Sequence, residues 1–513
     1  MNISGFHGPS ALLAMLSFAI YEWDAEGKIP RDWISRVDGV LAHEATVTIT
    51  PSTMEATQLS ITGVQLINSL DGVGDPHFDQ FLAAVRVLQL LDEWHEPLAL
   101  EGGMATALSD DHEEALWRLQ VEGGAYNPKG SWGSVIPARA PGVERTVSAD
   151  DAGVVARLLH FTAYLPPESA AGDPDDSAAP SGRHVELRYV ASMPRRSIDP
   201  RAVEDAPTIA VSPVLQDLSD AEITVRRSPD RYGVEVKYDP SRLKDIVSKA
   251  IKEKARLLFM PEMVINAHMI ADLAKAIRKA VSEWFDISDD LPTLRYVIAG
   301  VAGADGGGVG NSIVVLDIEG SEVLRQDKLC RWNLKPHHQR NYGVRPSCAD
   351  HEPALKEDIP GGRLVYIADL EGLGRFLTLI CADMDYDKPG DWLLRNVAVD
   401  WLHAPIMDKS IAWFKDAGGE IQPWIVARAQ RAAELGVPKV VVTNSLLLTL
   451  RLNVENGKSG SLYPPLTDCS VAFMLDSEAN NITFRQISVP VPSVALVVQA
   501  VKWRLRFETF PPP

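Results

Sequence analysis

The amino-acid sequence predicts an α/β protein that is preceded by a mainly helical region. Two observations lead to this class. From residue 207 onward, short apolar segments alternate with segments that carry an apolar face at helical spacing, and the Pro-, Ala-, Ser-, Asp- and Gly-rich stretch Pro166–Arg183 separates them from the first part of the chain. Strand–helix–strand alternation is typical of sandwiches built from βαβ-type units. We therefore divide the 513 residues into a helical domain at 1–165, a linker at 166–206 and an α/β domain at 207–513.

Three segments of the first domain have the apolar spacing of helices. They are Pro76–Leu98, His112–Val121 and Ser148–Leu165, the last of which begins with the capping sequence Ser-Ala-Asp-Asp. The apolar run Ala11–Ile20 has about ten residues, whereas a helix that spans a membrane needs about 20. No Lys or Arg precedes this run, as it would in a signal peptide. We therefore expect a buried helix there.

The elements of the second domain follow from short apolar or alternating segments. The linker contains one possible strand, His184–Ser192, in which polar and apolar residues alternate. Further strands are predicted at Thr208–Val214, Arg256–Met260, Arg295–Ala302, Ser312–Asp317, Gly374–Ile380, Asp400–Ala404 and Lys439–Thr443, and helices at Pro240–Lys254 and Ala271–Phe285. A domain of roughly 300 residues is long enough for one substantial core.

Charge and cysteine content narrow the classes of partner and compartment. The chain has 50 Lys and Arg residues against 69 Asp and Glu residues, a net charge of −19. Phosphate-rich partners repel such a chain, so we expect neither nucleic acid nor a membrane as its main partner. Its cysteines, Cys330, Cys348, Cys381 and Cys469, form no CxxC pair. Such sparse cysteines suggest a reducing compartment, and we expect a cytoplasmic protein.

Three motifs that can carry chemistry occur in a fixed order. Glu262 follows a buried strand in Phe259-Met260-Pro261-Glu262, and Lys328 follows a strand that begins after the turn glycine Gly320. Cys381 ends the apolar strand Leu377-Thr-Leu-Ile-Cys381 and is followed by Ala382 and Asp383. Strand ends are where α/β sheets place reactive groups.

These motifs resemble the signature of the carbon–nitrogen hydrolase (nitrilase) superfamily, which has a Glu after "PE", a Lys downstream of a turn glycine, and a Cys in "C-x-D" or "C-x-E". The resemblance covers about 207–513. Further segments that match the family are Asn311-Ser312 with Asp317 and Gly320, Pro389 and Arg395 after the cysteine, Trp424 with Ala427-Arg428-Ala429, and Val440–Asn444.

The resemblance implies a four-layer α-β-β-α sandwich, no cofactor or metal, and assembly into a homo-oligomer. It also implies a second glutamate between the lysine and the cysteine, for which Glu352 is slightly preferred over Glu357. Asp383 in the C-x-D motif favours an amide or carbamoyl substrate over a nitrile, so the substrate site is expected to include Asp383 and Ala382. Lys335 is a rival for the role of Lys328.

The residues themselves support amide hydrolysis. A free thiol has a pKa near ~8.5, which a nearby Lys328 ammonium would lower. Glu262 would take the thiol proton and pass it to the leaving amine. Lys328 and a backbone N–H near Ala382 would stabilise the oxyanion. Cys381 would carry the thioester, and Glu262 would then activate water.

Two other hypotheses stay open. In the first, the α/β domain is a nitrilase-like sensor, effector or binding module, for example of a bacterial defence system, and residues 1–200 recognise a protein partner. In the second, the protein is an acyl- or amidotransferase in which an amine replaces water.

Three further motifs have ordinary explanations. Gly303–Gly310 is glycine-rich but lacks the Gly-Lys-Ser/Thr of a phosphate-binding loop, and we expect a flexible loop at the rim of the site. His337, His338 and His351 have no standard zinc spacing. The acidic stretch Met384–Asp387 is expected to be a solvated loop rather than a metal site.

Overall fold

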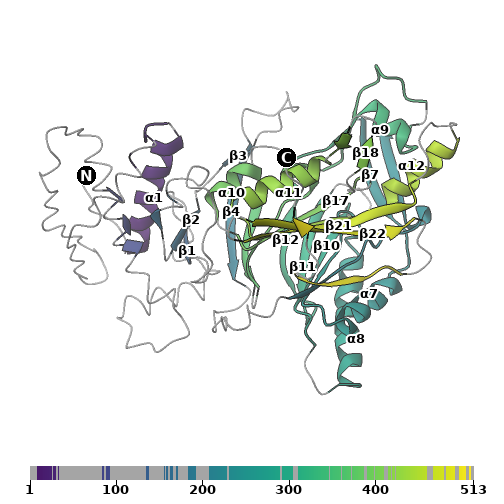
Figure 1. Ribbon diagram of the computed structural model, residues 1–513, viewed down its shortest axis with the longest axis horizontal. Coiled ribbons are helices and arrows are strands. Elements are labelled where there is room, and N and C mark those ends of the chain that lie inside the picture. Colours follow the sequence, from purple (N-terminus) through teal and green to yellow (C-terminus); the bar gives the residue numbers. More distant parts are fainter. Residues whose placement is uncertain are drawn as a thin grey trace, which may run out of the picture.

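The computed structural model (Figure 1) describes most of the chain from residue 207 onward and short pieces before it. The described residues before 207 are 9–25, 27–30, 33, 84–85, 88–89, 91–92, 134–137, 155, 158–159, 162–165, 169–171 and 183–191. From 207 they are 207–503 and 508–509, except for 228–229, 289–291, 304–309, 346, 360, 371–372, 386–389, 398, 410–413, 417–418, 422, 459–465, 479–480 and 492–495.

The apolar run near the start of the chain forms a buried helix, as predicted. It lies within α1 (Pro9–Ala25), where Leu13, Ala14 and Ile20 are buried. Of the helices in the described part of the chain, none is long and apolar enough to cross a membrane.

The other predictions for the first domain are only partly covered by the described residues. Residues 84–85, 88–89 and 91–92 of the predicted helix Pro76–Leu98 are helical, while His112–Val121 lies outside the described residues. The end of the predicted helix Ser148–Leu165 is a strand instead. There, β2 (Thr162–Leu165) pairs antiparallel with β1 (Ser134–Pro137), so its backbone hydrogen bonds go to a neighbouring strand.

Strands and helices alternate from residue 207, and the chain is an α/β protein with several mixed sheets, as predicted. The helices and helical turns are η2 (Leu218–Asp220), α7 (Ser241–Lys252), α8 (Met269–Phe285), α9 (Pro336–Asn341), η3 (Cys381–Met384), α10 (Trp392–Asn396), α11 (Trp424–Glu434) and α12 (Leu447–Lys458). The strands up to the first cysteine are β3 (Ser169–Ala171), β4 (Arg183–Ala191), β5 (Thr208–Val211), β6 (Ala221–Arg227), β7 (Asp230–Val236), β8 (Leu257–Phe259), β9 (Ile265–Asn266), β10 (Tyr296–Ala302), β11 (Asn311–Asp317) and β12 (Glu322–Asp327). The later strands are β13 (Asn333–Leu334), β14 (Leu355–Glu357), β15 (Leu364–Leu370), β16 (Gly374–Thr378), β17 (Trp401–Ile406), β18 (Phe414–Asp416), β19 (Gly419–Ile421), β20 (Lys439–Asn444), β21 (Asp468–Glu478), β22 (Asn481–Pro490), β23 (Gln499–Lys502) and β24 (Glu508–Thr509).

Two large sheets form the centre of the described structure. A seven-stranded sheet has the order β12-β11-β10-β8-β5-β23, with β9 beside β10, and its strands β5, β8 and β10 are parallel. A nine-stranded sheet has the order β24-β22-β21-β20-β17-β16-β15-β4-β3. The strand predicted within the linker is β4, which pairs parallel with β15, so this sheet includes residues before 207.

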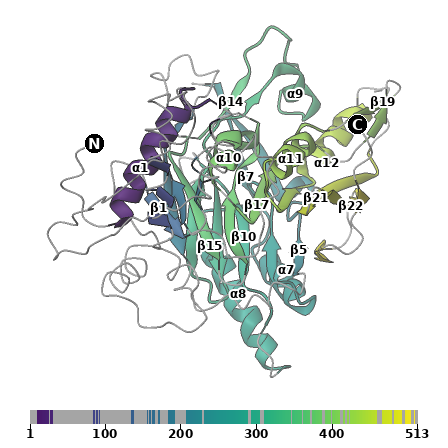
Figure 2. The same ribbon diagram turned by 60° about the vertical axis from the view of Figure 1, so that its left-hand side comes forward.

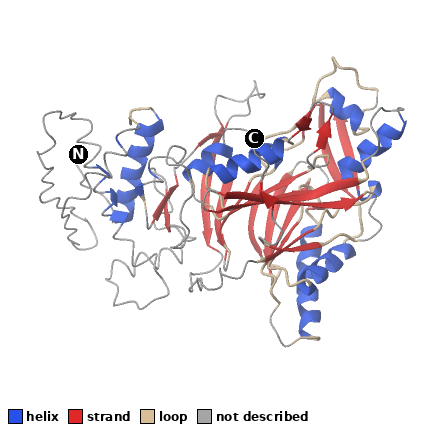
Figure 3. Cartoon of the chain, in the orientation of Figure 1, coloured by secondary structure: helices blue, strands red, loops and turns tan. Residues whose placement is uncertain are grey.

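The packing follows the order helices, sheet, sheet, helices (Figures 1 and 3). Successive side chains of a strand point to opposite faces. In β10, Val297 and Ala299 pack with α7 and α8, whereas Tyr296 and Ile298 pack toward the nine-stranded sheet. Buried residues of α10 and α11 cover the outer face of that second sheet. The core therefore lies between and on both sides of the two sheets.

The sequence did not predict a smaller sheet with the order β13-β14-β7-β6. In Figure 2 its strand β14 and the helix α9 lie at the upper end of the molecule. Arg226 and Arg231 each form an ion pair of 3.0 Å with Asp358, which directly follows β14. The two arginines thus tie β14 to the strands β6 and β7.

Candidate active site

The directions of neighbouring strands bring three polar residues to the same end of the seven-stranded sheet. Glu262 follows β8, Asn311 begins β11 and Lys328 follows β12. Strand β10 is parallel to β8 and antiparallel to β11, and β11 is antiparallel to β12. These three positions therefore lie at the same end of the sheet, where β8 ends. Cys381 follows β16 of the facing sheet.

The side chains at this end of the sheet form a buried, hydrogen-bonded cluster. The Lys328 Nζ donates to Glu262 Oε1 at 2.8 Å and to Glu357 Oε2 at 2.7 Å. The Asn311 Nδ2 donates to Glu262 Oε1 at 2.6 Å and to Glu357 Oε1 at 2.7 Å. The side chains of Lys328, Glu262 and Glu357 are 1%, 3% and 1% exposed. Two carboxyl groups thus surround one ammonium where water does not screen them.

The second glutamate of the cluster is Glu357 rather than Glu352, the residue that the sequence slightly favoured. Glu352 accepts a hydrogen bond from the Ala349 N–H at 3.0 Å, and its side chain is 38% exposed beside Arg345. Glu357 lies in β14, where Leu355 and Glu357 are buried and Lys356 between them is exposed. The strand alternation, which the sequence analysis did not use, is the signal that separates the two glutamates.

Lys328 and not its rival Lys335 joins the cluster. Lys335 is exposed and directly precedes α9. The backbone carbonyl of Lys328 accepts a hydrogen bond from the Gly362 N–H at 2.7 Å. A Cβ at Gly362 would lie 2.7 Å from the carbonyl oxygen of Asp327, so a glycine is needed for this close approach.

Glu262 is held by a tight turn that packs on β10. The next residue, Met263, has a φ of 54°, in the left-handed region that non-glycine residues rarely adopt. The Gly300 N–H donates to the Pro261 carbonyl at 3.1 Å. A Cβ at Gly300 would collide with that carbonyl oxygen and would lie 2.6 Å from the Glu262 Cα. The missing side chain of Gly300 therefore lets the Glu262 turn lie directly against the strand.

Cys381 also has an unusual backbone conformation. Its φ is 47°, and it begins the helical turn η3 directly beyond the strand β16. A strained backbone of this kind costs on the order of 1–3 kcal/mol and is common at functional sites. The residue is 6% exposed. The strand path therefore breaks at the candidate nucleophile.

The Asp383 carboxylate connects the cysteine turn with the chain after the lysine. It accepts hydrogen bonds from the N–H groups of Cys330 (2.7 Å), Leu329 (3.1 Å) and Ile380 (3.2 Å), and it is fully buried. Its oxygens thus serve three backbone donors, and its expected contact with substrate stays a prediction. Ala382 is buried in the same turn, and its proposed backbone contribution to an oxyanion stays a prediction.

The side chain of Gln326 also joins the two large sheets. Gln326 is 1% exposed, and its Nε2 donates to the Thr378 carbonyl at 2.8 Å while its Oε1 accepts from the Tyr366 N–H at 3.0 Å. Gln326 precedes Lys328 by two residues, and Thr378 precedes Cys381 by three. The two sheets are thus joined at the point from which the lysine and the cysteine extend.

A third carboxylate, Asp408, follows the neighbouring strand β17 and influences the thiol. Asp408 accepts hydrogen bonds from Trp424 Nε1 at 3.0 Å and from the Tyr342 hydroxyl at 3.4 Å. The Trp332 ring stacks with Trp424, with 6.4 Å between their centroids. The negative charge of Asp408 contributes to raising the pKa of Cys381. Trp424 belongs to a segment that resembles the family, whereas Asp408, Tyr342 and Trp332 belong to no short sequence motif that would have identified them.

The resting cluster favours a protonated thiol. Burial raises the pKa of Cys381 well above its usual value, and Glu262 raises it further, whereas Lys328 lowers it by less. Lys328 thus lowers the pKa of the thiol, as predicted, but burial and Glu262 raise it by more. Burial also raises the pKa of Glu262. For Lys328, burial lowers the pKa, but the two carboxylates together raise it well above its usual value.

Metal-ligating residues do not gather into a group of three in the described part of the chain. The rings of His337 and His338 lie 3.9 Å apart at the start of α9. Most of the glycine-rich segment Gly303–Gly310 and two residues of Met384–Asp387 lie outside the described residues.

No protein-family model and no curated protein matches this sequence. Among solved structures, the chain is similar to an amidase from Nesterenkonia sp., with a TM-score of 0.26 and 16% identity, over 47% of this chain and 76% of that one. It is also similar to the NitFhit protein of C. elegans, with a TM-score of 0.30 and 16% identity, over 57% of this chain and 60% of that one.

Proposed function

We propose that this protein is a thiol-dependent hydrolase that cleaves the carbon–nitrogen bond of an amide or carbamoyl substrate, with a nitrilase-like four-layer sandwich as its scaffold. The observation that carries the proposal is the buried cluster of Glu262, Lys328 and Glu357 beside Cys381. These groups comprise a nucleophile, a base and a cation, which together meet the chemical needs of amide hydrolysis.

The charge of the cluster supports a concerted first step. Burial and the Glu262 carboxylate make a resting thiolate unfavourable, so the proton leaves the thiol as the sulfur–carbon bond forms. Lys328 and Asn311 both donate to Oε1 of Glu262, which makes Oε2 the oxygen that accepts this proton. The electron pair of the carbonyl moves to its oxygen, where the Lys328 ammonium stabilises it.

The remaining steps return every group to its starting state. Glu262 gives its proton to the nitrogen as the carbon–nitrogen bond breaks, and the amine or ammonia leaves a thioester on Cys381. Water then loses a proton to Glu262 and attacks the thioester carbon. The carbon–sulfur bond breaks, the thiol regains its proton and the acid is released. Glu357 keeps Lys328 charged and in place throughout.

The test compares ammonia release by the wild type, Cys381→Ala and Cys469→Ala across a panel of amides and carbamoyl compounds. Cys469 is a matched control because it is also a buried cysteine, but its thiol hydrogen-bonds to Thr449 in another part of the core. We expect Cys381→Ala to lose at least about 10⁴-fold in activity and Cys469→Ala to keep most of it. Equal activity of Cys381→Ala and wild type would overturn the proposal.

A labelling experiment separates an enzyme from a binding module. Iodoacetamide should modify Cys381 in the wild type at a rate that changes in Glu262→Gln, because the carboxylate takes part in the ionisation of the thiol. Mass spectrometry of the peptides identifies the modified cysteine. Labelling of all four cysteines at similar, Glu262-independent rates would favour a module without this chemistry.

A further inference from the structure

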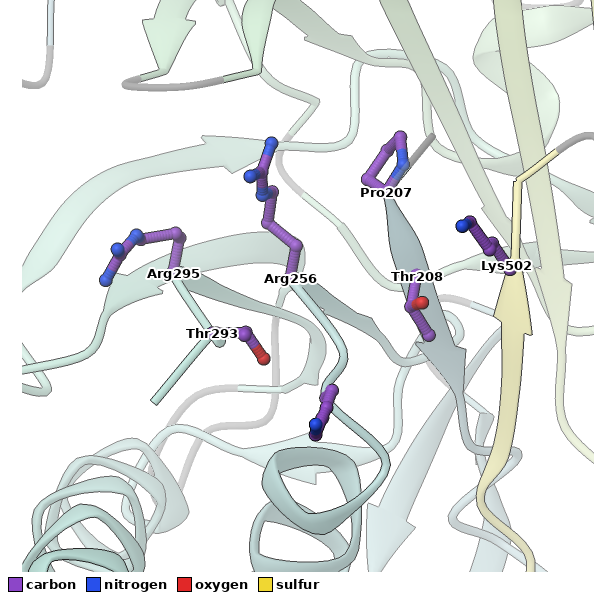
Figure 4. A pocket seen from close by; sticks show the side chains of 7 residues that line it. Pro207, Thr208, Arg256, Thr293, Arg295 and Lys502 are labelled. Carbon is purple, nitrogen blue, oxygen red and sulfur yellow. The ribbon is translucent and has the colours of Figure 1, made fainter. Parts of the chain in front are cut away.

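A pocket of about 300 Å³ lies at the end of the seven-stranded sheet that is opposite to Glu262. It is formed where β5, β8 and β10 begin and where β23 ends. Figure 4 shows Arg256 between Arg295 on one side and Thr208 and Lys502 on the other. The described residues that line the pocket are Pro207, Thr208, Lys254, Arg256, Thr293, Arg295 and Lys502.

The charge of this pocket is opposite to that of the chain. Its four charged lining residues, Lys254, Arg256, Arg295 and Lys502, are all basic, although acidic residues outnumber basic ones by 69 to 50 in the whole sequence. Like charges that line one small space repel one another. A multivalent anion would relieve this repulsion and would be attracted into the pocket from solution.

Backbone hydrogen bonds hold the lining in place. The Arg256 N–H donates to the Thr208 carbonyl at 2.7 Å, and the Arg295 N–H donates to the Arg256 carbonyl at 2.8 Å. The hydroxyl of Thr293 donates to the Ala255 carbonyl at 3.1 Å. Two of the basic side chains therefore extend from adjacent strand starts that are fixed relative to each other, which reduces the entropy lost on binding.

We propose that this pocket binds a small multivalent anion that carries a di- or triphosphate group. Guanidinium groups bind phosphate oxygens in pairs, and two arginines flanked by two lysines match several phosphate charges. The volume suits such a group rather than a long polymer. Arg256 and Glu262 flank opposite ends of β8, so this site and the catalytic cluster are separate and the proposal does not depend on the proposed function.

The test measures binding of pyrophosphate, ATP, citrate and sulfate to the full-length protein by calorimetry. The pocket variant is Arg295→Gln with Lys502→Gln, and the control with the same charge change is Lys252→Gln with Lys279→Gln, whose lysines lie on α7 and α8. We expect pyrophosphate or ATP to bind the wild type and the control equally and the pocket variant about 100-fold more weakly, since each lost charged contact is worth about tenfold. Comparison of pyrophosphate with ATP tells whether the phosphates alone suffice.

A second variant keeps the test valid if the first one unfolds. Lys254 has a φ of 55°, a conformation that asparagine tolerates, so Lys254→Asn removes one charge with little backbone strain. It should weaken binding about tenfold. Cys381→Ala should bind pyrophosphate like the wild type, which separates this site from the hydrolase proposal. Equal binding to pocket and control variants, no binding of any of these anions, or binding of a single-stranded oligonucleotide alone would overturn the proposal.

Discussion

The two ends of the strand β8 place charged side chains in opposite surroundings, one buried and one open to solvent. Glu262 follows its C-terminal end and is 3% exposed, with Lys328 and Asn311 bound to its carboxylate. Arg256 precedes its N-terminal end and lines an open pocket with three other basic residues. Charge that is removed from water must be compensated inside the protein, whereas charge that lines an open pocket stays in contact with solvent. The first arrangement suits chemistry on a captured substrate, and the second suits reversible binding of an ion.

Removal of the buried Lys328 ammonium should cause the largest change in the free energy of unfolding. Lys328→Met leaves the Glu262 and Glu357 carboxylates buried without their ammonium, and we expect a loss of about 3–5 kcal/mol in the free energy of unfolding. The exposed Lys335→Met should change it by less than about 0.5 kcal/mol. Urea unfolding of both variants measures the difference. Similar values for the two would mean that the cluster does not depend on its internal ion pairs.

The pH dependence of stability should reveal the buried Asp383 carboxyl. Burial raises its pKa from 3.8 to about 7, so between these pH values the unfolded chain releases a proton that the folded chain retains. Asp383 therefore stabilises the fold fully below pH 3.8, and this contribution is lost as the pH rises to about 7, a change of a few kcal/mol. The non-titrating Asp383→Asn should lack this slope. Unfolding curves of both proteins between these limits give the difference, and parallel pH profiles would contradict it.

The two candidate glutamates offer a matched pair. Glu357→Gln removes one of the carboxylates that hold Lys328, and we expect kcat/KM for amide hydrolysis to fall about 100-fold, or about 2.7 kcal/mol. Glu352→Gln, outside the cluster, should change it by less than about twofold. As Glu357 positions Lys328, the pH–rate profile of Glu357→Gln should also shift, a result that a loss of folded protein would not produce. Equal effects of the two changes would reject the assignment.

The contact between the Glu262 turn and β10 can be tested with two glycines. Gly300→Ala forces a methyl group into the Pro261 carbonyl and should destabilise the protein by about 1–3 kcal/mol. A Cβ at Gly457, near the end of α12, meets no atom within 4 Å, so Gly457→Ala should instead stabilise by about 0.5–1 kcal/mol. Thermal unfolding of the two variants checks the signs. A neutral Gly300→Ala would show that the turn can move away from the strand.

The smallest effect is expected at the basic end of β8. Without an anion, Arg295→Gln with Lys502→Gln relieves repulsion and should raise the free energy of unfolding by up to about 0.5 kcal/mol at low salt. The control pair Lys252→Gln and Lys279→Gln should not, because both lysines attract Glu283. Added salt should reduce the difference because it screens exposed charges. A loss of stability in the pocket variant would show that these cations are compensated within the fold.

Periodicity was sufficient to predict many of the central elements. The predicted strands Arg256–Met260 and Arg295–Ala302 correspond to β8 and β10, and the predicted helix Ala271–Phe285 lies within α8. Buried strands and amphipathic helices leave a local pattern because each side chain's environment repeats along the chain. The strand Thr162–Leu165 has no such independent signal, since its pairing partner β1 lies far away in the sequence.

The candidate site, too, was predicted only in part from the sequence. The order of Glu262, Lys328 and Cys381 after predicted strands, together with the resemblance to a family signature, was enough to select these residues as candidates. The choice between Glu352 and Glu357 needed the pairing of β14 with β13 and β7, which sets the inward face of that strand. The roles of Asn311 and Gln326 needed the positions of neighbouring strands and sheets, which no spacing in the sequence records.

The sequence alone determined the alternation of strands and helices and the acidic character of the chain, and it singled out Cys381, Glu262 and Lys328 as candidates for the thiol, the base and the lysine. The tertiary structure decided which second glutamate completes the cluster, that Asp383 serves backbone donors, that the thiol rests protonated, and that four basic residues line one pocket. The physical reason is that patterning is a property of neighbours along the chain. Burial, hydrogen bonding and electrostatic coupling depend on neighbours in space.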